Sequence, residues 1–412
     1  IFTSEVALFD AAERGLSTLE AASFLGPEAG DALALYRDLR TQRLVPPKGR
    51  RRAPAVVPGK PTEADLTYCK DALLAVSRTF ARPIQMLEEP LQTAVMCGYL
   101  LCRIADTIED HDGFTIPERD ERYGLWLEAL YSYRTTQSAV NAFAQSFVDV
   151  DGVPAEMELA RNTGTVLRVF ATLPDGMQIK TLRWVAEMTR GMQLYSHRTA
   201  GHDGIAALHT VEDLERYCYF VAGTVGHMLT DLFVEAFGEE GGPMELGLRK
   251  DAEAFGVGLQ LTNILKDVTD DRERSVSFIP RVATEEKGLP IRDLTDPAKR
   301  DTAHAAVAPI FDRAEDRLRR ALEYTLAIPN DQVAVRLFCL LPLWMAVRTL
   351  IHARGNDAMF TAGQAVKISR AEVEQLIAEC VKNARDDDAL REGYAQLWQT
   401  PASAPRPATT VH

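Results

Sequence analysis

The chain has 412 residues, of which 46% are hydrophobic and 25% charged, and 59 acidic against 46 basic side chains give a net charge of −13. This composition excludes a disordered chain, a collagen and a coiled-coil rod, and it supplies enough apolar material for a sizeable core. The acidity argues against nucleic acid as a partner, because phosphate backbones are bound by clustered Lys and Arg. If the substrate is nevertheless an anion, a divalent cation is the simplest way to offset the charge.

Residues 1–62 combine helix-forming segments rich in Ala and Leu with a proline-rich basic connector that contains Arg50, Arg51 and Arg52. Proline at this density prevents a regular helix. We interpret the basic run as a solvated linker, and contact with an anionic lipid surface is the alternative. The first residues lack the basic and apolar regions of a signal peptide, so a cytoplasmic protein is expected.

From residue 63 to 390 the apolar residues recur with a helical period, and turn signals such as Asp112-Gly113 separate the segments. Thr210 and Asp213 precede an apolar run with the spacing of a helix N-terminal cap. The sequence has no convincing alternating strand pattern and no Rossmann or P-loop glycine motif. We therefore predict an all-α fold with a single large helical domain over 63–390, preceded by the segment 1–62 and followed by a C-terminal tail over 391–412.

The most apolar stretch, residues 337–347, contains Pro342 and falls short of the roughly 20 residues that span a bilayer, which predicts a buried helix. The cysteines include no Cys-x-x-Cys pair and are too few for a disulfide framework in so long a chain. We predict reduced and mostly buried thiols for all of them. They are Cys69, Cys97, Cys102, Cys218, Cys339 and Cys380.

The first of two acidic clusters follows an apolar segment and comprises Asp106, Glu109 and Asp110. At about 100° per residue, Asp106 and Asp110 lie on one face of a helix, one turn apart, and Arg103 continues that stripe. The other positions of this helix, among them Val95, Leu100, Leu101, Ile104 and Ala105, are largely apolar, which predicts a helix buried on much of its circumference. A solvated acidic face and ion pairing with basic neighbours are the alternatives.

The second cluster has the same helical spacing and comprises Gln260, Asn263, Asp267 and Asp271. These residues form one stripe beside a separate apolar stripe of the same predicted helix. Gly256 and Gly258 lie one turn upstream. Because glycine costs a helix about 1 kcal/mol relative to alanine, two glycines here call for a reason, such as the close approach of a ligand.

Paired carboxylates of this kind suit magnesium chemistry. Mg²⁺ prefers oxygen ligands and typically takes one or two carboxylates, with waters and substrate phosphates completing its octahedron. Two such helices facing each other would form a negative cup that binds Mg²⁺, and the ion would neutralise a diphosphate leaving group. If the diphosphate is allylic, its departure leaves a carbocation that an apolar, aromatic-lined cavity can shelter from water.

Together the motifs resemble those of the squalene/phytoene synthases, all-α enzymes that join two prenyl diphosphates head to head. The resemblance covers about residues 63–355 and implies an isoprenoid-synthase-type helical domain with a central apolar cavity. Its last motif has a Phe-Cys-x-x-Pro form that favours the squalene synthase branch. In chain order the motifs are Ser77-Arg78-Thr79-Phe80 with Arg103 and 106–110, then 216–226, then 260–271 ending at Pro280, and Phe338-Cys339-Leu340-Leu341-Pro342.

The resemblance also implies roles for individual side chains. Tyr217 would be the general acid/base of the first half-reaction, for which a phenol with a usual pKa near 10 needs nearby charge. Phe80 and Phe338 would face the prenyl chains or the carbocation, with plain core packing as the alternative. The implied Mg²⁺ ligands are Asp106, Glu109, Asp110, Asn263, Asp267 and Asp271. The implied substrate contacts are Arg78, Thr79, Phe80, Arg103, Gln260, Asn263, Lys266 and Phe338.

The activity that the resemblance implies is squalene synthesis: Mg²⁺-dependent condensation of two farnesyl diphosphates to presqualene diphosphate, then reduction by NADPH. The family's Gly-Gly-Arg-Glu stretch is altered here, because Val276 occupies the position of the arginine. Arg272 and Arg274 are the candidate substitutes. This departure leaves open a dehydrosqualene or phytoene synthase, or an enzyme that stops at presqualene diphosphate.

Two further alternatives stay open. One is terpene cyclisation of a single diphosphate, and the other is a non-catalytic helical scaffold that binds isoprenoid lipids. The membrane-anchoring C-terminal helix of eukaryotic relatives is missing, so a soluble enzyme, or one peripheral at a membrane surface, is expected.

Overall fold

The computed structural model describes residues 61–77, 79–197, 203–238 and 240–401. Within these ranges the chain is almost entirely helical, which confirms the predicted all-α class. Two short parallel strands, β1 (Ala206–Ala207) and β2 (Val276–Ser277), pair with each other. The basic connector and nearly all of the predicted segment 1–62 lie outside the described residues.

The described residues fold into two compact units. One unit lies within residues 1–199 and 215–245, and the other lies within residues 200–214 and 246–412. We predicted one helical domain over 63–390, and helix packing instead divides this range between two units.

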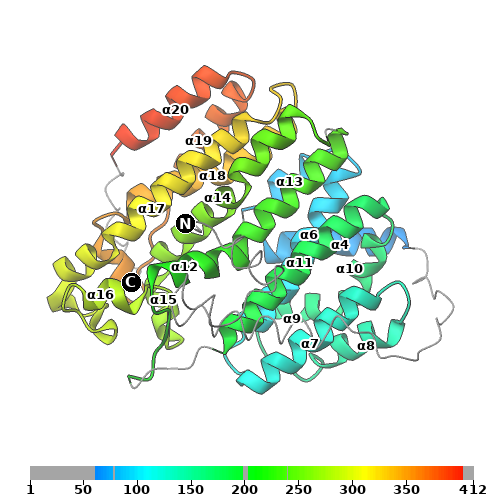
Figure 1. Cartoon of the computed structure of the whole chain (residues 1–412), viewed down its shortest axis with the longest axis horizontal. Coiled ribbons are helices and arrows are strands. Elements are labelled where there is room, and N and C mark those ends of the chain that lie inside the picture. Colours follow the sequence, from blue (N-terminus) through cyan, green and yellow to red (C-terminus); the bar gives the residue numbers. More distant parts are fainter. Residues whose placement is uncertain (1–60, 78, 198–202, 239, 402–412) are drawn as a thin grey trace, which may run out of the picture. The chain divides into compact units, whose positions relative to one another are not determined.

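In the first unit, α11 is the helix around which others gather: it packs against α6, α7 and α13 (Figure 1). On another side of α6, α10 packs against both α4 and α6. The elements of this unit are α4 (Glu63–Val76), α5 (Ala81–Gln85), α6 (Leu91–Asp110), α7 (Ile116–Ser132), α8 (Gln137–Gln145), α9 (Pro154–Arg161), α10 (Thr163–Phe170), α11 (Asp175–Ser196), the end of α12 (Val211–Cys218), the π-helical η1 (Tyr219–Gly223) and α13 (Thr224–Phe237).

The start of α12 confirms the predicted cap. The backbone N–H of Asp213 donates to Oγ1 of Thr210 at 3.1 Å, and the N–H of Thr210 donates to Oδ2 of Asp213 at 3.3 Å. These reciprocal bonds satisfy backbone donors that a helix N-terminus otherwise leaves unpaired. The segment that leads to Tyr217 therefore starts from a fixed helix end.

A π-helical turn, η1, follows α12 directly after Tyr217 and Cys218. Such turns are rare and occur often at functional sites. Helix α11 can approach η1 because residue 191 is glycine: a Cβ there would overlap Cβ and Cγ of Phe220. Since these Phe220 atoms are close to the backbone, they cannot move aside without moving η1.

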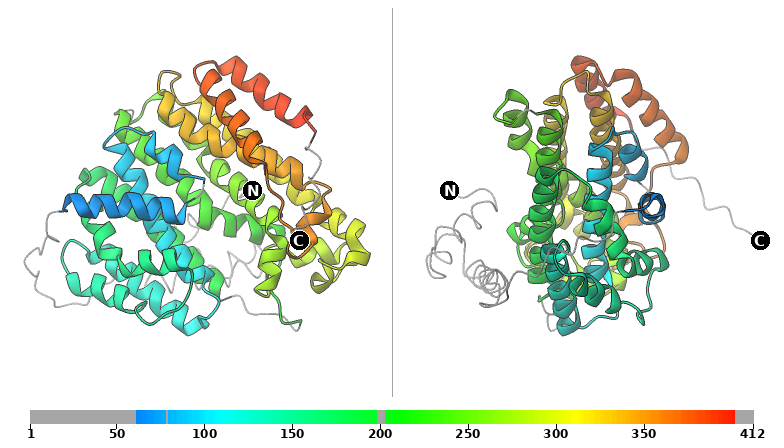
Figure 2. Two further views of the ribbon diagram at one scale, coloured as in Figure 1. Left: turned by 180° about the vertical axis from the view of Figure 1, so that it is seen from behind. Right: turned by 90° about the vertical axis from the view of Figure 1, so that its right-hand side faces the viewer.

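In the second unit, α17 and α18 run alongside each other, and α19 and α20 pack against α18 (Figures 1 and 2). The last two helices are drawn in orange and red at one end of this unit. Its elements are β1, most of α14 (Pro243–Lys266), α15 (Val268–Glu273), β2, α16 (Arg281–Glu285), η2 (Ile291–Asp293), η3 (Pro297–Lys299), α17 (Arg300–Leu326), α18 (Val333–Ala353), η4 (Asp357–Phe360), α19 (Arg370–Asn383) and α20 (Asp387–Gln399).

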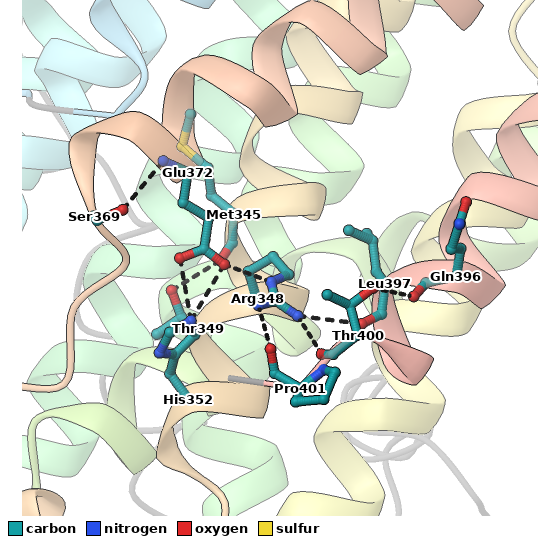
Figure 3. A network of polar contacts seen from close by, with 10 residues as sticks. All are labelled: Met345, Arg348, Thr349, His352, Ser369, Glu372, Gln396, Leu397, Thr400 and Pro401. Atoms are coloured by element: carbon teal, nitrogen blue, oxygen red, sulfur yellow. Dashed lines mark hydrogen bonds and ion pairs between the residues drawn. The ribbon is translucent and has the colours of Figure 1, made fainter. Parts of the chain in front are cut away.

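Helix α20 runs through the predicted start of the C-terminal tail at residue 391, so that boundary is too early. Tyr394 and Leu397 are buried beyond it. Arg348 of α18 fixes the end of the helix, since its Nη1 donates to the carbonyl oxygen of Thr400 at 2.7 Å while its Nε pairs with Glu372 of α19 at 2.6 Å (Figure 3).

Two helical stretches of the described residues, Val211–Phe237 and Val333–Ala353, are long and apolar enough to cross a membrane by length and composition alone. Their most apolar windows are 61% and 78% buried inside the structure, as in core helices of globular proteins. The second stretch contains Pro342, in agreement with the predicted buried helix. All of the cysteines are buried and free, as predicted.

Candidate active site

The first acidic cluster lies at the C-terminal end of α6, where the prediction placed it. Asp106 and Glu109 are partly buried, and Asp110 is exposed on the last turn. Most of the helix before them is buried, including Ile104, Ala105 and Ile108 between the polar positions. The cluster is therefore the polar end of a core helix and not part of a solvated acidic face.

Arg103 is held by groups from two helices. Its Nε lies 3.6 Å from Oδ2 of Asp106, and its Nη1 lies 3.9 Å from Oε1 of Glu156 at the start of α9. Its Nη2 also contacts the hydroxyl of Tyr99 at 3.4 Å. One guanidinium is thus shared between two carboxylates. Glu156 was not predicted, because it belongs to no motif and reaches the cluster only through packing of α9 against α6.

Burial raises the pKa values of three carboxyl groups here, those of Asp106, Glu109 and Glu156. The pKa of Asp106 rises to about 7, although Arg103 opposes the shift and Asp110 and Glu156 add to it. The pKa of Glu109 lies well above its usual range for the same reason, increased further by Asp110 and Asp106. Negative charge here exceeds what the basic neighbours offset, and a bound cation would favour the ionised forms.

Tyr217 meets the first acidic cluster directly. It is 4% exposed and forms a side-chain hydrogen bond with Glu109. The ring of Tyr195 from α11 stands edge-on to it, with centroids 5.5 Å apart. Burial and the nearby carboxylate of Glu109 also raise the pKa of Tyr123 from α7. Tyr195 and Tyr123 were not predicted, since each is one of many aromatic residues at a helical core position.

The remaining predicted residues of the first unit lie before α6. Arg78 is outside the described residues. Thr79 is exposed, and Phe80 is partly buried with its N–H donating to Oγ of Ser77 at 3.0 Å. The Phe80 ring lies 5.9 Å from the ring of Tyr99, which also contacts Arg103. The structure therefore brings Phe80 to the stripe that Arg103 and Asp106 continue.

The second acidic cluster does not lie on one unbroken helix. Helix α14 ends at Lys266, α15 begins at Val268, and Asp267 between them has φ −106° and ψ 18°. Backbone bonding nevertheless continues, because the N–H of Asp267 donates to the carbonyl of Asn263 and that of Asp271 to the carbonyl of Asp267, each at 3.0 Å. The predicted single stripe keeps its spacing but is distorted at Asp267.

Each aspartate of this second cluster has a basic partner close by in sequence. Lys266 forms an ion pair with Asp267. Nη2 of Arg274 lies 2.8 Å from Oδ1 of Asp271, which is buried. The alternative of ion pairing with basic neighbours is thus realised in the ligand-free protein. Of the other predicted residues, Gln260 is partly buried, Asn263 is exposed, and Phe338 of α18 is buried.

Helix packing accounts for Gly258. A Cβ there would lie 3.1 Å from the backbone nitrogen of Leu318 and 3.2 Å from the carbonyl carbon of Arg317, both on α17. The sequence suggested the close approach of a ligand as one reason for this glycine, and at Gly258 the close approach is made by another helix.

The donor set fits magnesium. Among residues 61–77, 79–197, 203–238 and 240–401, no three His, Cys, Asp or Glu side chains converge as they stand on a common metal position. Mg²⁺ usually needs only one or two protein carboxylates, because waters and phosphate oxygens supply the rest. Asp106 with Asp110, and Asp267 with Asp271, offer oxygen donors of this kind one helical turn apart.

Comparison with known proteins points to one family. A sequence model of the squalene/phytoene synthase family matches residues 73–372. The squalene synthase of Schizosaccharomyces pombe is 27% identical over 324 residues, which cover 78% of this chain and 67% of that protein. The squalene synthase ERG9 of Candida albicans is 30% identical over 331 residues, which cover 78% and 69%.

Solved structures give the same grouping. A complex of TcSQS with the ligand BPH1237 superposes with a TM-score of 0.68 at 26% identity, covering 81% of this chain and 92% of that one. A dehydrosqualene synthase in complex with a ligand has a TM-score of 0.52 at 20% identity, covering 78% and 96%, a likeness of fold.

Proposed function

Because this chain belongs to the squalene/phytoene synthase family and is a prenyltransferase of that family's type, we propose that it is a squalene synthase. It would condense two farnesyl diphosphates head to head in a Mg²⁺-dependent reaction that gives presqualene diphosphate, and then reduce this product with NADPH. The observation that carries the proposal is the buried carboxylate cluster on α6, with Tyr217 hydrogen-bonded to its Glu109.

In this proposal the two acidic clusters hold the diphosphate ends of the substrates through Mg²⁺. Asp106, Glu109 and Asp110 would supply oxygen ligands in the first cluster, and Asn263, Asp267 and Asp271 would supply them in the second. When bound, Mg²⁺ neutralises the diphosphate and assists its departure as a Lewis acid. Arg78, Thr79, Arg103, Gln260 and Lys266 would contact phosphate oxygens, for which cationic and amide donors are suited.

Tyr217 would move the proton of the first half-reaction. Its hydroxyl is oriented by Glu109, and the departing diphosphate would be the proton partner, which offsets the high usual pKa of a phenol. Tyr195 packs edge-on against it and limits its rotation. Phe80 and Phe338 would shelter the prenyl chains and the carbocation from water.

The altered stretch before Pro280 supports a second candidate. Val276 stands where the family carries an arginine, and in this protein it lies in β2, paired with Ala206. An enzyme that lacks this charge can complete the first half-reaction and stop at presqualene diphosphate, or form dehydrosqualene or phytoene without reduction. We further propose a cytoplasmic enzyme with peripheral contact to a membrane, into which an apolar product would pass.

Product analysis tests this proposal. The protein is incubated with farnesyl diphosphate and Mg²⁺, with and without NADPH, and in parallel with geranylgeranyl diphosphate. We expect squalene only when NADPH is present and presqualene diphosphate when it is omitted. Presqualene diphosphate or dehydrosqualene under both conditions would favour the second candidate. Formation of none of these products would contradict the proposal.

A further inference from the structure

Arg274 occupies a distinctive place beside the second acidic cluster. Its Nη2 lies 2.8 Å from Oδ1 of Asp271, and its side chain is 31% exposed whereas that of Asp271 is 9% exposed. The guanidinium is therefore partly accessible to solvent, while the carboxylate is covered. A charge-assisted contact of this length is strong but can be exchanged for another anion of the right shape.

The backbone brings Arg274 back onto Asp271. The N–H of Arg274 donates to the carbonyl of Asp271 at 3.1 Å, and the N–H of Ser275 donates to the carbonyl of Arg272 at 3.0 Å. Ser275 has φ 58°, in the left-handed region that costs a residue with a side chain about 1 kcal/mol or more. This turn ends α15 and directs the chain into β2, so the position of Arg274 is set by the backbone as well as by the ion pair.

Arg272 has different surroundings, although it is only two positions away. It lies near Arg281, which binds both carboxylate oxygens of Asp203 at 2.7 and 3.0 Å. Within the described part of the chain, its Nε and Nη1 are buried without a hydrogen-bond partner. Of the two candidates for the charge missing at Val276, only Arg274 is in contact with a carboxylate of the second cluster.

We propose that Arg274 is a diphosphate-binding residue of the second acidic cluster and takes the place of the arginine missing at position 276. This inference rests on the proposed function and names a further contact of the same site. In the structure Arg274 pairs with Asp271. If Asp271 bound the cation that accompanies a diphosphate, the guanidinium would become available, and its planar fork would suit two phosphate oxygens at once.

If Arg274 binds diphosphate, its loss should weaken the binding of pyrophosphate but not the binding of Mg²⁺. If Arg274 only stabilised the local structure, its loss should weaken both. In Arg274→Gln, Asp271 loses a competing cation, so Mg²⁺ alone should bind at least as tightly as in the wild type. Inorganic pyrophosphate at saturating Mg²⁺ should bind about tenfold more weakly or worse, the usual effect of one lost charge-assisted contact. Isothermal titration of both ligands measures this, with the thermal midpoint as a check of folding.

Two matched variants complete the test. Arg274→Lys keeps the charge but lacks the planar fork, so it should recover only part of the pyrophosphate affinity. Arg272→Gln should stay within about twofold of the wild type. The inference is overturned if Arg274→Gln binds pyrophosphate like the wild type, if Arg272→Gln loses as much affinity, or if Arg274→Gln weakens Mg²⁺ and pyrophosphate together. These binding results do not depend on the product analysis. If the wild type forms no coupled product, the proposed function fails. If the Arg274 variants bind pyrophosphate like the wild type, only the assignment of Arg274 fails.

Discussion

The two acidic clusters hold similar residues in opposite electrostatic states. The first cluster comprises Asp106, Glu109 and Asp110 on α6, and Glu156 of α9 lies close to it. Arg103 interacts with two of these carboxylates, those of Asp106 and Glu156. At the α14–α15 junction, Lys266 pairs with Asp267 and Arg274 pairs with Asp271. The first cluster thus has more carboxyl groups than basic partners, and burial favours their neutral forms. Each aspartate of the second cluster has a cation of its own.

This difference indicates how each cluster would respond to ligands. Binding a cation at the first cluster relieves repulsion between carboxylates that burial already disfavours as ions. At the second cluster the same event has to displace a lysine or an arginine, which then becomes available to a phosphate group. We therefore expect the first cluster to depend more on pH and the second to depend more on its basic residues.

The largest effect is expected from removing one carboxylate of either cluster. Asp106→Asn and Asp267→Asn should each lower the rate of prenyl coupling by about a hundredfold or more, because the variant loses the negative charge with which the carboxylate holds a diphosphate-bound cation. The controls are the exposed neighbours Asp112→Asn and Asp270→Asn, which should keep nearly full activity. Steady-state rates with farnesyl diphosphate measure this. Unchanged Mg²⁺-dependent binding of diphosphate in both cluster variants would refute the metal assignment.

A second prediction concerns pH. Since the pKa of Asp106 is raised to about 7, its contribution to the stability of the ligand-free protein is full at low pH and is lost as pH rises through 7. Between pH 6 and 8 this loss amounts to about 1 kcal/mol. Because Mg²⁺ binds the ionised form, its stabilising effect should be larger at pH 8 than at pH 6.

Denaturation curves of the wild type and Asp106→Asn at both pH values, with and without Mg²⁺, measure this effect. The variant should lose the part of the pH dependence that Asp106 supplies, and Asp267→Asn should keep it. Equal pH slopes in the wild type and Asp106→Asn would show that Asp106 does not titrate in this range.

The smallest effects are expected from two glycine substitutions, one near each cluster, that change helix packing. Gly191→Ala should reduce the free energy of unfolding by about 2 to 3 kcal/mol, because the new methyl group overlaps Phe220 of η1. Gly258→Ala meets α17 at 3.0 Å or more, and its gain in helix propensity offsets part of the crowding, so a change within about 1 kcal/mol is expected. Urea unfolding of both variants measures the difference. A smaller loss for Gly191→Ala than for Gly258→Ala would contradict this order.

Sequence patterns that depend only on residues close together in the chain predicted much of the secondary structure. Apolar periodicity is set by neighbours along the chain, and it correctly gave the helical class, the buried helix around Pro342 and the acidic end of α6. The cap formed by Thr210 and Asp213 is equally local and was also correct. Spacing at helical intervals placed Asp106 and Asp110 on one face because α6 is continuous there.

What escaped prediction depends on packing between distant segments. Glu156 reaches the first cluster only through packing of α9, and Gly258 is explained by α17 and not by a ligand. The break at Asp267 leaves the residue spacing unchanged, so no sequence pattern reports it. The π-helical turn after Tyr217 also packs closely against another helix, at Gly191 of α11, and this contact between distant segments leaves no local sequence pattern.

A mixed-label experiment shows whether this protein joins two prenyl diphosphates. Equal amounts of unlabelled and deuterated farnesyl diphosphate are incubated with the protein and Mg²⁺, and the extracted products are analysed by mass spectrometry. We predict a product that carries one labelled and one unlabelled farnesyl unit and that disappears when Mg²⁺ is chelated. Products that contain a single farnesyl unit, with no mixed species, would contradict the account.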